Sequence, residues 1–286
     1  LLYKASPEDC KLLLIDPKQV EFMPYEGIPH LIVPKVISDI TKATNALQWA
    51  LDEMERRFRL IREARVKDID EYNFTPEVVS GKQKKMPFVV IIIDEFSDFI
   101  MQGKKEVEDR IIRLGQKARA SGIHLILATQ YPTTEYVTGG IKANFPSRIA
   151  FKVASRVNSD VILGMTGAEK LLGHGDMLYA PQEYSSAPKR VQGCFVTTRE
   201  IGDIVNFVTT NNEPIFDKDI QDAINNMPKN NSTEFGDRGG MDPLLPEALK
   251  ICIDAGQASV SMIQRRLYIG YPRAGRIVDQ MTVMGY

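Results

Sequence analysis

The chain has 286 residues, of which 43% are hydrophobic and 26% are charged, and its formal net charge is −1. These values indicate a globular chain with one large domain or two small ones, and no apolar run approaches the roughly 20 residues that span a bilayer as a helix. The small net charge excludes a uniformly basic nucleic-acid-binding protein, so any contact with DNA must come from local basic clusters.

Strand-like and helix-like segments alternate from residue 11 to residue 209. An apolar run at 11–15 predicts a first strand, and apolar residues at helical spacing between 39 and 64 predict a long helix with one buried face. The other expected segments are strands at 88–93 and 124–130, a helix at 105–120, strand-like runs at 148–154, 177–180 and 191–196, and a helix at 199–209. The alternation predicts an α/β fold with a mainly parallel sheet and helices on both faces.

The composition changes after residue 210. Residues 211–242 are rich in Asn, Asp, Gly and Pro, which predicts a partly disordered linker between a first domain at 1–210 and a second at 243–286. The second domain has three helical patterns, at 243–254, 259–267 and 272–281. The packing side of the third helix consists of Ile277, Val278 and Met281. These patterns predict a small all-helical or winged-helix module.

Two carboxylates directly follow a fully apolar strand in the stretch FVVIIIDEFSDFI. Because parallel strands deliver their C-terminal ends to the edge where α/β proteins bind ligands, Asp94 and Glu95 suit a nucleotide hydrolase. Asp94 would hold Mg²⁺ through a water molecule, and Glu95 would polarise the water that attacks the γ-phosphate of ATP. The alternative interpretation is a strand that ends in solvated acids, which cap the following helix.

A polar residue also ends the next predicted strand, in the stretch HLILATQ. Gln130 could lie beside the γ-phosphate and report its loss, or it could be a turn residue before Tyr131 and Pro132. Two polar tips on consecutive strands favour a ligand site over two unrelated turns.

Longer stretches of the chain resemble the FtsK/SpoIIIE family of DNA translocases. In chain order they are ASPEDCKLLLIDPKQVEF, YEGIPHL, DEMERRF, IIIDEFSDFI, GQKARASGIHLILATQ, GGIKANFPSRIAF, GAEKLLGHGDMLY and QRRLYIGYPRAGRIVDQM. The resemblance implies a RecA-like P-loop ATPase core, a homo-hexameric ring that moves double-stranded DNA with ATP, and a C-terminal winged-helix domain. It also implies a role in chromosome segregation at cell division or sporulation.

The resemblance further implies that the parent protein is membrane-anchored through an N-terminal region. Its motor would then lie on the cytoplasmic side of the bacterial inner membrane.

Residue roles follow from the resemblance position by position. Asp94 and Glu95 match the metal-binding and catalytic acids of the Walker B motif, and Gln130 matches the sensor. Arg119 matches an arginine offered across the subunit interface to the neighbour's nucleotide. Arg156 stands where the family usually has a lysine with a similar role, so the charge is kept although the guanidinium geometry differs. From the residues alone, Arg119 is better explained as a solvated helix-end cation.

The sequence departs from the family in its nucleotide site. No GxxxxGK[ST] loop occurs in the 286 residues, although such a loop supplies the backbone N–H groups and the lysine that hold the phosphates. In the family it lies about a dozen residues before the segment that matches LLYKASPED. We therefore expect the chain to be part of a longer protein, and to be inactive in ATP hydrolysis by itself.

A second departure concerns the contacts with DNA. The family often reads ATQRP after the sensor strand, whereas this chain has Tyr131 in place of the arginine, and a tyrosine brings no charge that releases counterions. Lys142, in GGIKANFPSR, keeps its charge at another position of the DNA channel. We expect Lys142 to contact the DNA backbone; the alternative is a plain surface lysine.

The C-terminal module is expected to bind DNA through its third helix. Arg273 and Arg276 lie near one face of that helix, and arginine pairs bidentately with guanine in the major groove. Pro272 and Asp279 replace the asparagine and glutamate that are usual in the family, so the resemblance does not indicate which DNA sequence this helix prefers. Arg265 could add a phosphate contact, or it could belong to an exposed basic corner.

Two other functions compete with the DNA-translocase hypothesis. A non-catalytic DNA-binding relative would explain the missing phosphate loop together with the winged-helix-like tail. A protein-secretion ATPase of the same superfamily is the other alternative, and the tail argues against it.

Overall fold

The computed structural model describes residues 1–182, 187–226, 244–255, 258–267, 274–275, 277–278 and 280–281. The chain divides into two compact units, Leu1–Pro228 and Lys229–Tyr286. Within the described ranges, no helix is both long enough and apolar enough to cross a membrane.

The first unit is built on a sheet of three parallel strands in the order β1-β2-β3. The strands are β1 (Cys10–Ile15), β2 (Phe88–Ile93) and β3 (Ile123–Leu127). The register aligns Ile15 with Ile93 and Ile93 with Leu127, so all three strands end at the same edge of the sheet. β1 and β2 are almost wholly apolar because both faces of the sheet are covered there, whereas His124 and Ile126 of β3 are exposed. The predicted parallel sheet is confirmed.

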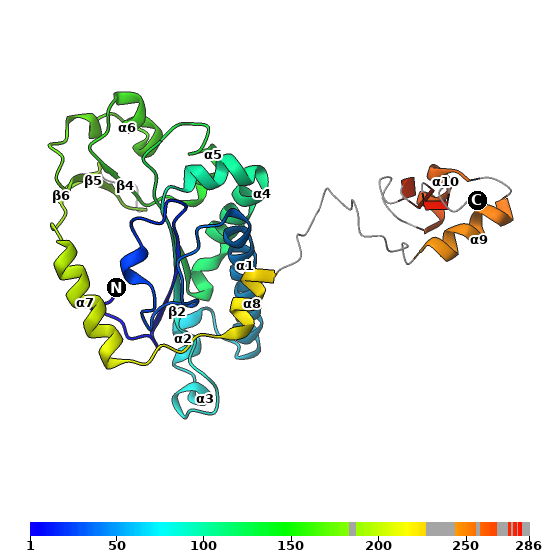
Figure 1. The fold of residues 1–286 in the computed structure, drawn as a ribbon, viewed down its shortest axis with the longest axis horizontal. Helices are drawn as coiled ribbons and strands as arrows, with labels where there is room; N and C mark the ends of the chain where they lie inside the picture. The colour runs from blue at the N-terminus through cyan, green and yellow to red at the C-terminus, as the bar shows by residue number, and fades with distance from the viewer. Residues whose placement is uncertain are drawn as a thin grey trace. The chain divides into compact units, whose positions relative to one another are not determined.

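Helices cover both faces of this sheet (Figure 1). On one face lie α1 (Ile40–Glu63), α4 (Phe96–Lys117) and α8 (Lys218–Asn226), and on the other lies α7 (Thr198–Asn211). The long helix α1 begins where predicted, because the carboxylate of Asp39 accepts the backbone N–H of Lys42 at 2.9 Å and so caps the first turn. In contrast, α4 begins directly after Glu95, nine positions earlier than the pattern at 105–120 predicted.

Three later strands form a separate antiparallel sheet in the order β4-β5-β6. They are β4 (Arg148–Phe151), β5 (Asp176–Ala180) and β6 (Lys189–Gln192). The alternating pattern had predicted a mainly parallel arrangement for them as well. Only residues 181–188 join β5 to β6, and a parallel connection needs about a dozen residues or more, so this pair must run antiparallel.

Short helical segments connect these elements. They are η1 (Met23–Tyr25), α2 (Ile69–Asn73), α3 (Pro76–Val79), η2 (Ala118–Ser121), α5 (Gly139–Asn144), α6 (Arg156–Leu163) and η3 (Ala168–Lys170).

The helix α8 lies inside the stretch 211–242 that its composition predicted to be a linker. Its Ile224 is buried against α1, and the side-chain amide of Asn45 donates a hydrogen bond to the Ile224 carbonyl at 3.0 Å. The first part of this stretch is therefore folded onto the first unit. The rest, from residue 227 onward, lies outside the described residues.

The second unit contains α9 (Leu245–Ala255) and α10 (Val260–Leu267). Its core consists of Leu245, Ala248, Ile263, Ala274, Ile277 and Met281, with Val278 packed beside them. The predicted packing side of the third helical pattern is thus confirmed. Arg273 and Arg276, the predicted DNA-reading residues, lie outside the described residues.

Candidate functional site

The C-terminal edge of the parallel sheet brings together residues that follow three different strands. The backbone N–H of Asp94 donates to the carbonyl of Ile15 at 2.9 Å, and the N–H of Phe96 donates to the carbonyl of Ala128 at 2.9 Å. These bonds extend the strand pairing beyond its last residues. The residues after β1, β2 and β3 therefore form one edge, as the sequence predicted for the acids and for the tip at Gln130.

Asp16, which directly follows β1, has a structural role at this edge. Its buried carboxylate accepts hydrogen bonds from the backbone N–H groups of residues 18–22, at 2.9–3.3 Å. Five donors on one carboxylate fix the shape of the loop. The loop places Lys18 next to Glu95 and Glu21 near Asp94.

Asp94 is half-buried among other acids. Burial raises the pKa of its carboxyl above the ordinary value, and the nearby charges of Asp16, Glu21 and Glu95 raise it further. Among the residues that the structure describes, no cation pairs with it. A divalent cation would relieve this repulsion, so the acidic environment fits a metal held through Asp94.

The described residues contain no group of three or more metal-ligating side chains.

Glu95 is fully buried, and both of its carboxylate oxygens are occupied. Oε1 accepts hydrogen bonds from the hydroxyl of Ser97 and from the hydroxyl of Thr129, the latter at 2.6 Å. Oε2 accepts the backbone N–H of Gln130 at 3.0 Å and lies 3.6 Å from the ammonium of Lys18. Burial by itself would raise the pKa of Glu95, but these four partners outweigh it and lower the pKa below its usual value.

The backbone of Glu95 adopts the left-handed conformation, with φ 46° and ψ 56°. This conformation is uncommon for a residue with a side chain and is found at functional sites when the surroundings enforce it. Although Glu95 occupies the N-cap position of α4, its side chain makes no capping hydrogen bond and is directed to the tip of β3 instead. The alternative of a solvated, helix-capping acid therefore does not describe Glu95.

The sequence interpretation missed three residues that contact Glu95. Thr129 stands next to the predicted Gln130, and Ser97 follows Glu95 by two positions, so both were within the stretches already singled out. Lys18 gave no local signal, because only the loop that Asp16 shapes brings it to Glu95. Gln130 itself contacts Glu95 through its backbone, while its side chain is exposed.

Arg119 lies at the opposite edge of the sheet. It belongs to η2, which precedes the N-terminal end of β3, whereas Glu95 follows the C-terminal end of the parallel strand β2. The length of β3 separates the two edges by about 13 Å, at a rise of about 3.3 Å per residue. The exposed Arg119 side chain is therefore remote from the acids of its own chain.

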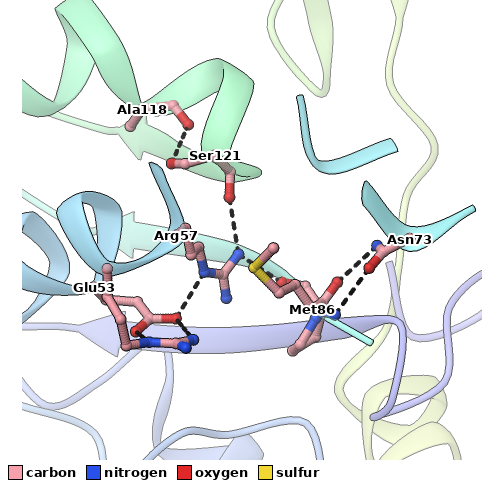
Figure 2. Close-up of polar contacts among 8 residues, drawn as sticks. Glu53, Arg57, Asn73, Met86, Ala118 and Ser121 are labelled. Carbon is pink, nitrogen blue, oxygen red and sulfur yellow. Dashed lines mark hydrogen bonds and ion pairs between the residues drawn. The ribbon is translucent and has the colours of Figure 1, made fainter. Parts of the chain in front are cut away.

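A buried arginine fixes the segment that carries Arg119 (Figure 2). Arg57 of α1 donates its Nη1 hydrogens to the carbonyls of Pro87, at 2.8 Å, and of Ser121, at 3.0 Å. Its Nε donates to Glu53 at 2.7 Å. The Arg57 side chain is only 3% exposed, so it joins α1, the start of β2 and η2 in the interior. Neighbouring bonds between Asn73 and Met86, both at 2.9 Å, fix the approach to β2.

The other predicted residues occupy separate places. Arg156 is the first residue of α6, and its exposed guanidinium lies 3.8 Å from the carboxylate of Glu169. Tyr131 follows Gln130 at the edge of the acids and is 59% exposed. Lys142 is half-buried in α5, and Arg265 is exposed on α10 of the second unit.

Comparison with known proteins decides the family. Residues 1–134 match the FtsK/SpoIIIE family, and residues 239–286 match the Ftsk gamma domain. The DNA translocase FtsK of Clostridium tetani is 47% identical over 287 residues, which cover 100% of this chain and 37% of that protein. The chain belongs to the FtsK/SpoIIIE family.

Relatives in other bacteria are similar over the same span. The DNA translocase FtsK of Haemophilus influenzae is 43% identical over 308 residues, covering 100% of this chain and 57% of that protein. This family member therefore spans about a third to just over half of the length of these two relatives. In the solved structure of the pCW3 conjugation coupling protein TcpA with ATPγS, 57% of the chain matches 72% of this one, with a TM-score of 0.61 and 24% identity. That likeness confirms the α/β fold.

Proposed function

We propose that this chain forms most of the motor of an ATP-driven double-stranded DNA translocase that acts in chromosome segregation. The observation that carries the proposal is the pair Asp94–Glu95 at the C-terminal edge of the parallel sheet. Asp94 lies among other acids without a cation partner among the described residues, which suits a bound cation. The lowered pKa of Glu95 keeps its carboxylate ionised, as a proton acceptor must be. The membership of the FtsK/SpoIIIE family supports the choice of DNA as the substrate.

ATP with Mg²⁺ is the proposed cofactor, and the metal would neutralise charge on the transferred phosphoryl group. Asp94 would hold the metal through a water molecule. Glu95 would orient the attacking water and accept its proton, and Gln130 would lie beside the γ-phosphate. The 286 residues contain no GxxxxGK[ST] loop, so the phosphates would be held by residues outside them, and the chain alone is proposed to be inactive.

Arg119 is proposed to act on the nucleotide of a neighbouring subunit in a homo-hexamer. Its place at the opposite edge of the sheet supports this assignment, because the arginine cannot reach the acids of its own chain. Arg156, exposed on α6, is proposed to assist from the same interface.

Mixing two inactive variants tests this arrangement. Glu95→Gln and Arg119→Ala should each abolish hydrolysis in homogeneous rings of the full-length protein. In an equimolar mixture with exchanging subunits, roughly a quarter of the sites combine an intact Glu95 with an intact Arg119 from the neighbour, and activity should return to about that fraction. If the mixture stays as inactive as its components, Arg119 does not act across the interface.

Contacts with DNA are proposed for both units. Tyr131 follows β3 at the edge of the acids, and Lys142 lies in α5, which packs against the C-terminal half of α4. Both would face the DNA channel, with Lys142 contributing the charge. In the second unit, Arg265, Arg273 and Arg276 would contact duplex DNA. The parent protein is proposed to be anchored in the bacterial inner membrane, with this motor on its cytoplasmic side.

Steady-state ATP hydrolysis by the full-length parent and by the 286-residue chain, each with and without duplex DNA, tests the proposal. We expect the full-length parent to hydrolyse ATP and the 286-residue chain not to do so. We also expect duplex DNA to accelerate hydrolysis by the parent. Hydrolysis that DNA leaves unchanged would favour the secretion-ATPase alternative. DNA binding without hydrolysis by either protein would favour the non-catalytic relative.

A further inference from the structure

Glu95 is held in a conformation in which it cannot serve as a base. Its side chain is 0% exposed, so water cannot approach the carboxylate. Oε1 is taken by two hydroxyl groups, and Oε2 by a backbone N–H and a lysine. A general base must lie within hydrogen-bonding reach of the proton that it accepts. At least one of these partners must therefore leave before Glu95 can contact an attacking water.

We propose that Ser97 and Thr129 are positioning residues that hold Glu95 in this resting conformation until DNA binds. This inference rests on the proposed function, in which Glu95 is the base of a DNA-stimulated ATPase. It adds a reason why hydrolysis would be slow without DNA.

Thr129 connects Glu95 to the loop that is proposed to contact DNA. Its hydroxyl donates to Glu95 at 2.6 Å and accepts the backbone N–H of Tyr131 at 2.9 Å. The hydroxyl oxygens of Thr129 and Ser97 lie 3.2 Å apart, so the two holding groups are in contact. Tyr131 is 59% exposed, so DNA could contact and displace it. Displacement of Tyr131 would move Thr129 and weaken the hydrogen bond between Thr129 and Glu95.

The backbone of Glu95 favours release once these bonds are lost. Its left-handed conformation, with φ 46°, persists only while the surrounding contacts enforce it. The hydroxyl of Thr129 and the backbone N–H of Gln130, which follow the end of β3, supply two of those contacts. When these contacts are lost, rotation of the Glu95 backbone toward the right-handed helical conformation would change the direction of its carboxylate.

The test uses the full-length parent protein and compares hydrolysis without DNA to hydrolysis with saturating duplex DNA. Thr129→Val removes the hydroxyl but keeps the shape, so we expect the DNA-free rate to rise about tenfold, the factor for the loss of one hydrogen bond to a charged group. The ratio of the rate with DNA to the rate without DNA should fall by about the same factor. Ser97→Ala should act in the same direction, and Thr129→Ser, which keeps the hydroxyl, should behave as the wild type.

Thr134→Val is the matched control, because Thr134 is exposed in the same loop and is remote from the Glu95 hydrogen bonds. Its DNA-free rate should equal that of the wild type. A DNA-free rate of Thr129→Val and Ser97→Ala that is unchanged or lower, measured beside an active wild type, overturns the holding role. A wild-type protein without any hydrolysis overturns the proposed function instead, so the two failures are distinguishable.

Discussion

Replacing Glu95 with glutamine in the full-length protein is expected to lower ATP hydrolysis at least about a hundredfold while ATP binding stays intact. Glutamine keeps the size of the side chain and one acceptor oxygen, so most of the contacts around position 95 can re-form. Its amide cannot take a proton from water. The change therefore removes the base and leaves the site in place.

Single-turnover hydrolysis and the binding of a fluorescent ATP analogue separate these two effects. Glu135→Gln is the matched control, since Glu135 is exposed in the loop after β3 and its change should leave both quantities unaltered. Appreciable hydrolysis by Glu95→Gln would rule out Glu95 as the base. A loss of ATP binding would show that Glu95 has a structural role at the site.

Replacing Arg57 with alanine is expected to lower the free energy of unfolding by about 3–5 kcal/mol, the range for breaking a buried, hydrogen-bonded ion pair. The change leaves the carbonyls of Pro87 and Ser121 without their donor, and it removes one of the two cations on Glu53. These contacts are lost in the interior, because the Arg57 side chain is only 3% exposed. Because the contacts join α1 to β2 and η2, their loss also frees the segment that carries Arg119 (Figure 2).

Arg56→Ala is the control for this prediction. Arg56 also pairs with Glu53, at 2.6 Å, but it is half-exposed and joins only one turn of α1. A solvated pair of this kind contributes less than about 1 kcal/mol. Urea unfolding of both variants should show a large shift of the midpoint for Arg57→Ala alone, with the slope unchanged. Equal shifts for the two variants would contradict the prediction that the buried Arg57 contacts stabilise the fold more than the solvated Arg56 pair.

The sequence by itself determined the parallel sheet of the first unit and the long helix that packs on it. The apolar runs that became β1 and β2 are buried on both faces, so their composition alone indicated a parallel sheet. The spacing of Leu47, Leu51 and Met54 marked the buried face of α1, and Asp39 marked its start. The polar residues after β2 and β3 predicted the location of the site, because parallel strands end at one edge.

Only the tertiary structure decided how the site residues are oriented. No local pattern predicts the left-handed turn at Glu95, the arrival of Lys18 or the hydroxyl contacts, since these depend on the strand register and on the loop that Asp16 shapes. The antiparallel direction of β6 and the docking of α8 on α1 likewise follow from connection length and from packing. Hydrophobic periodicity records which residues are buried, whereas the partner of each polar group is set by segments far apart in the chain.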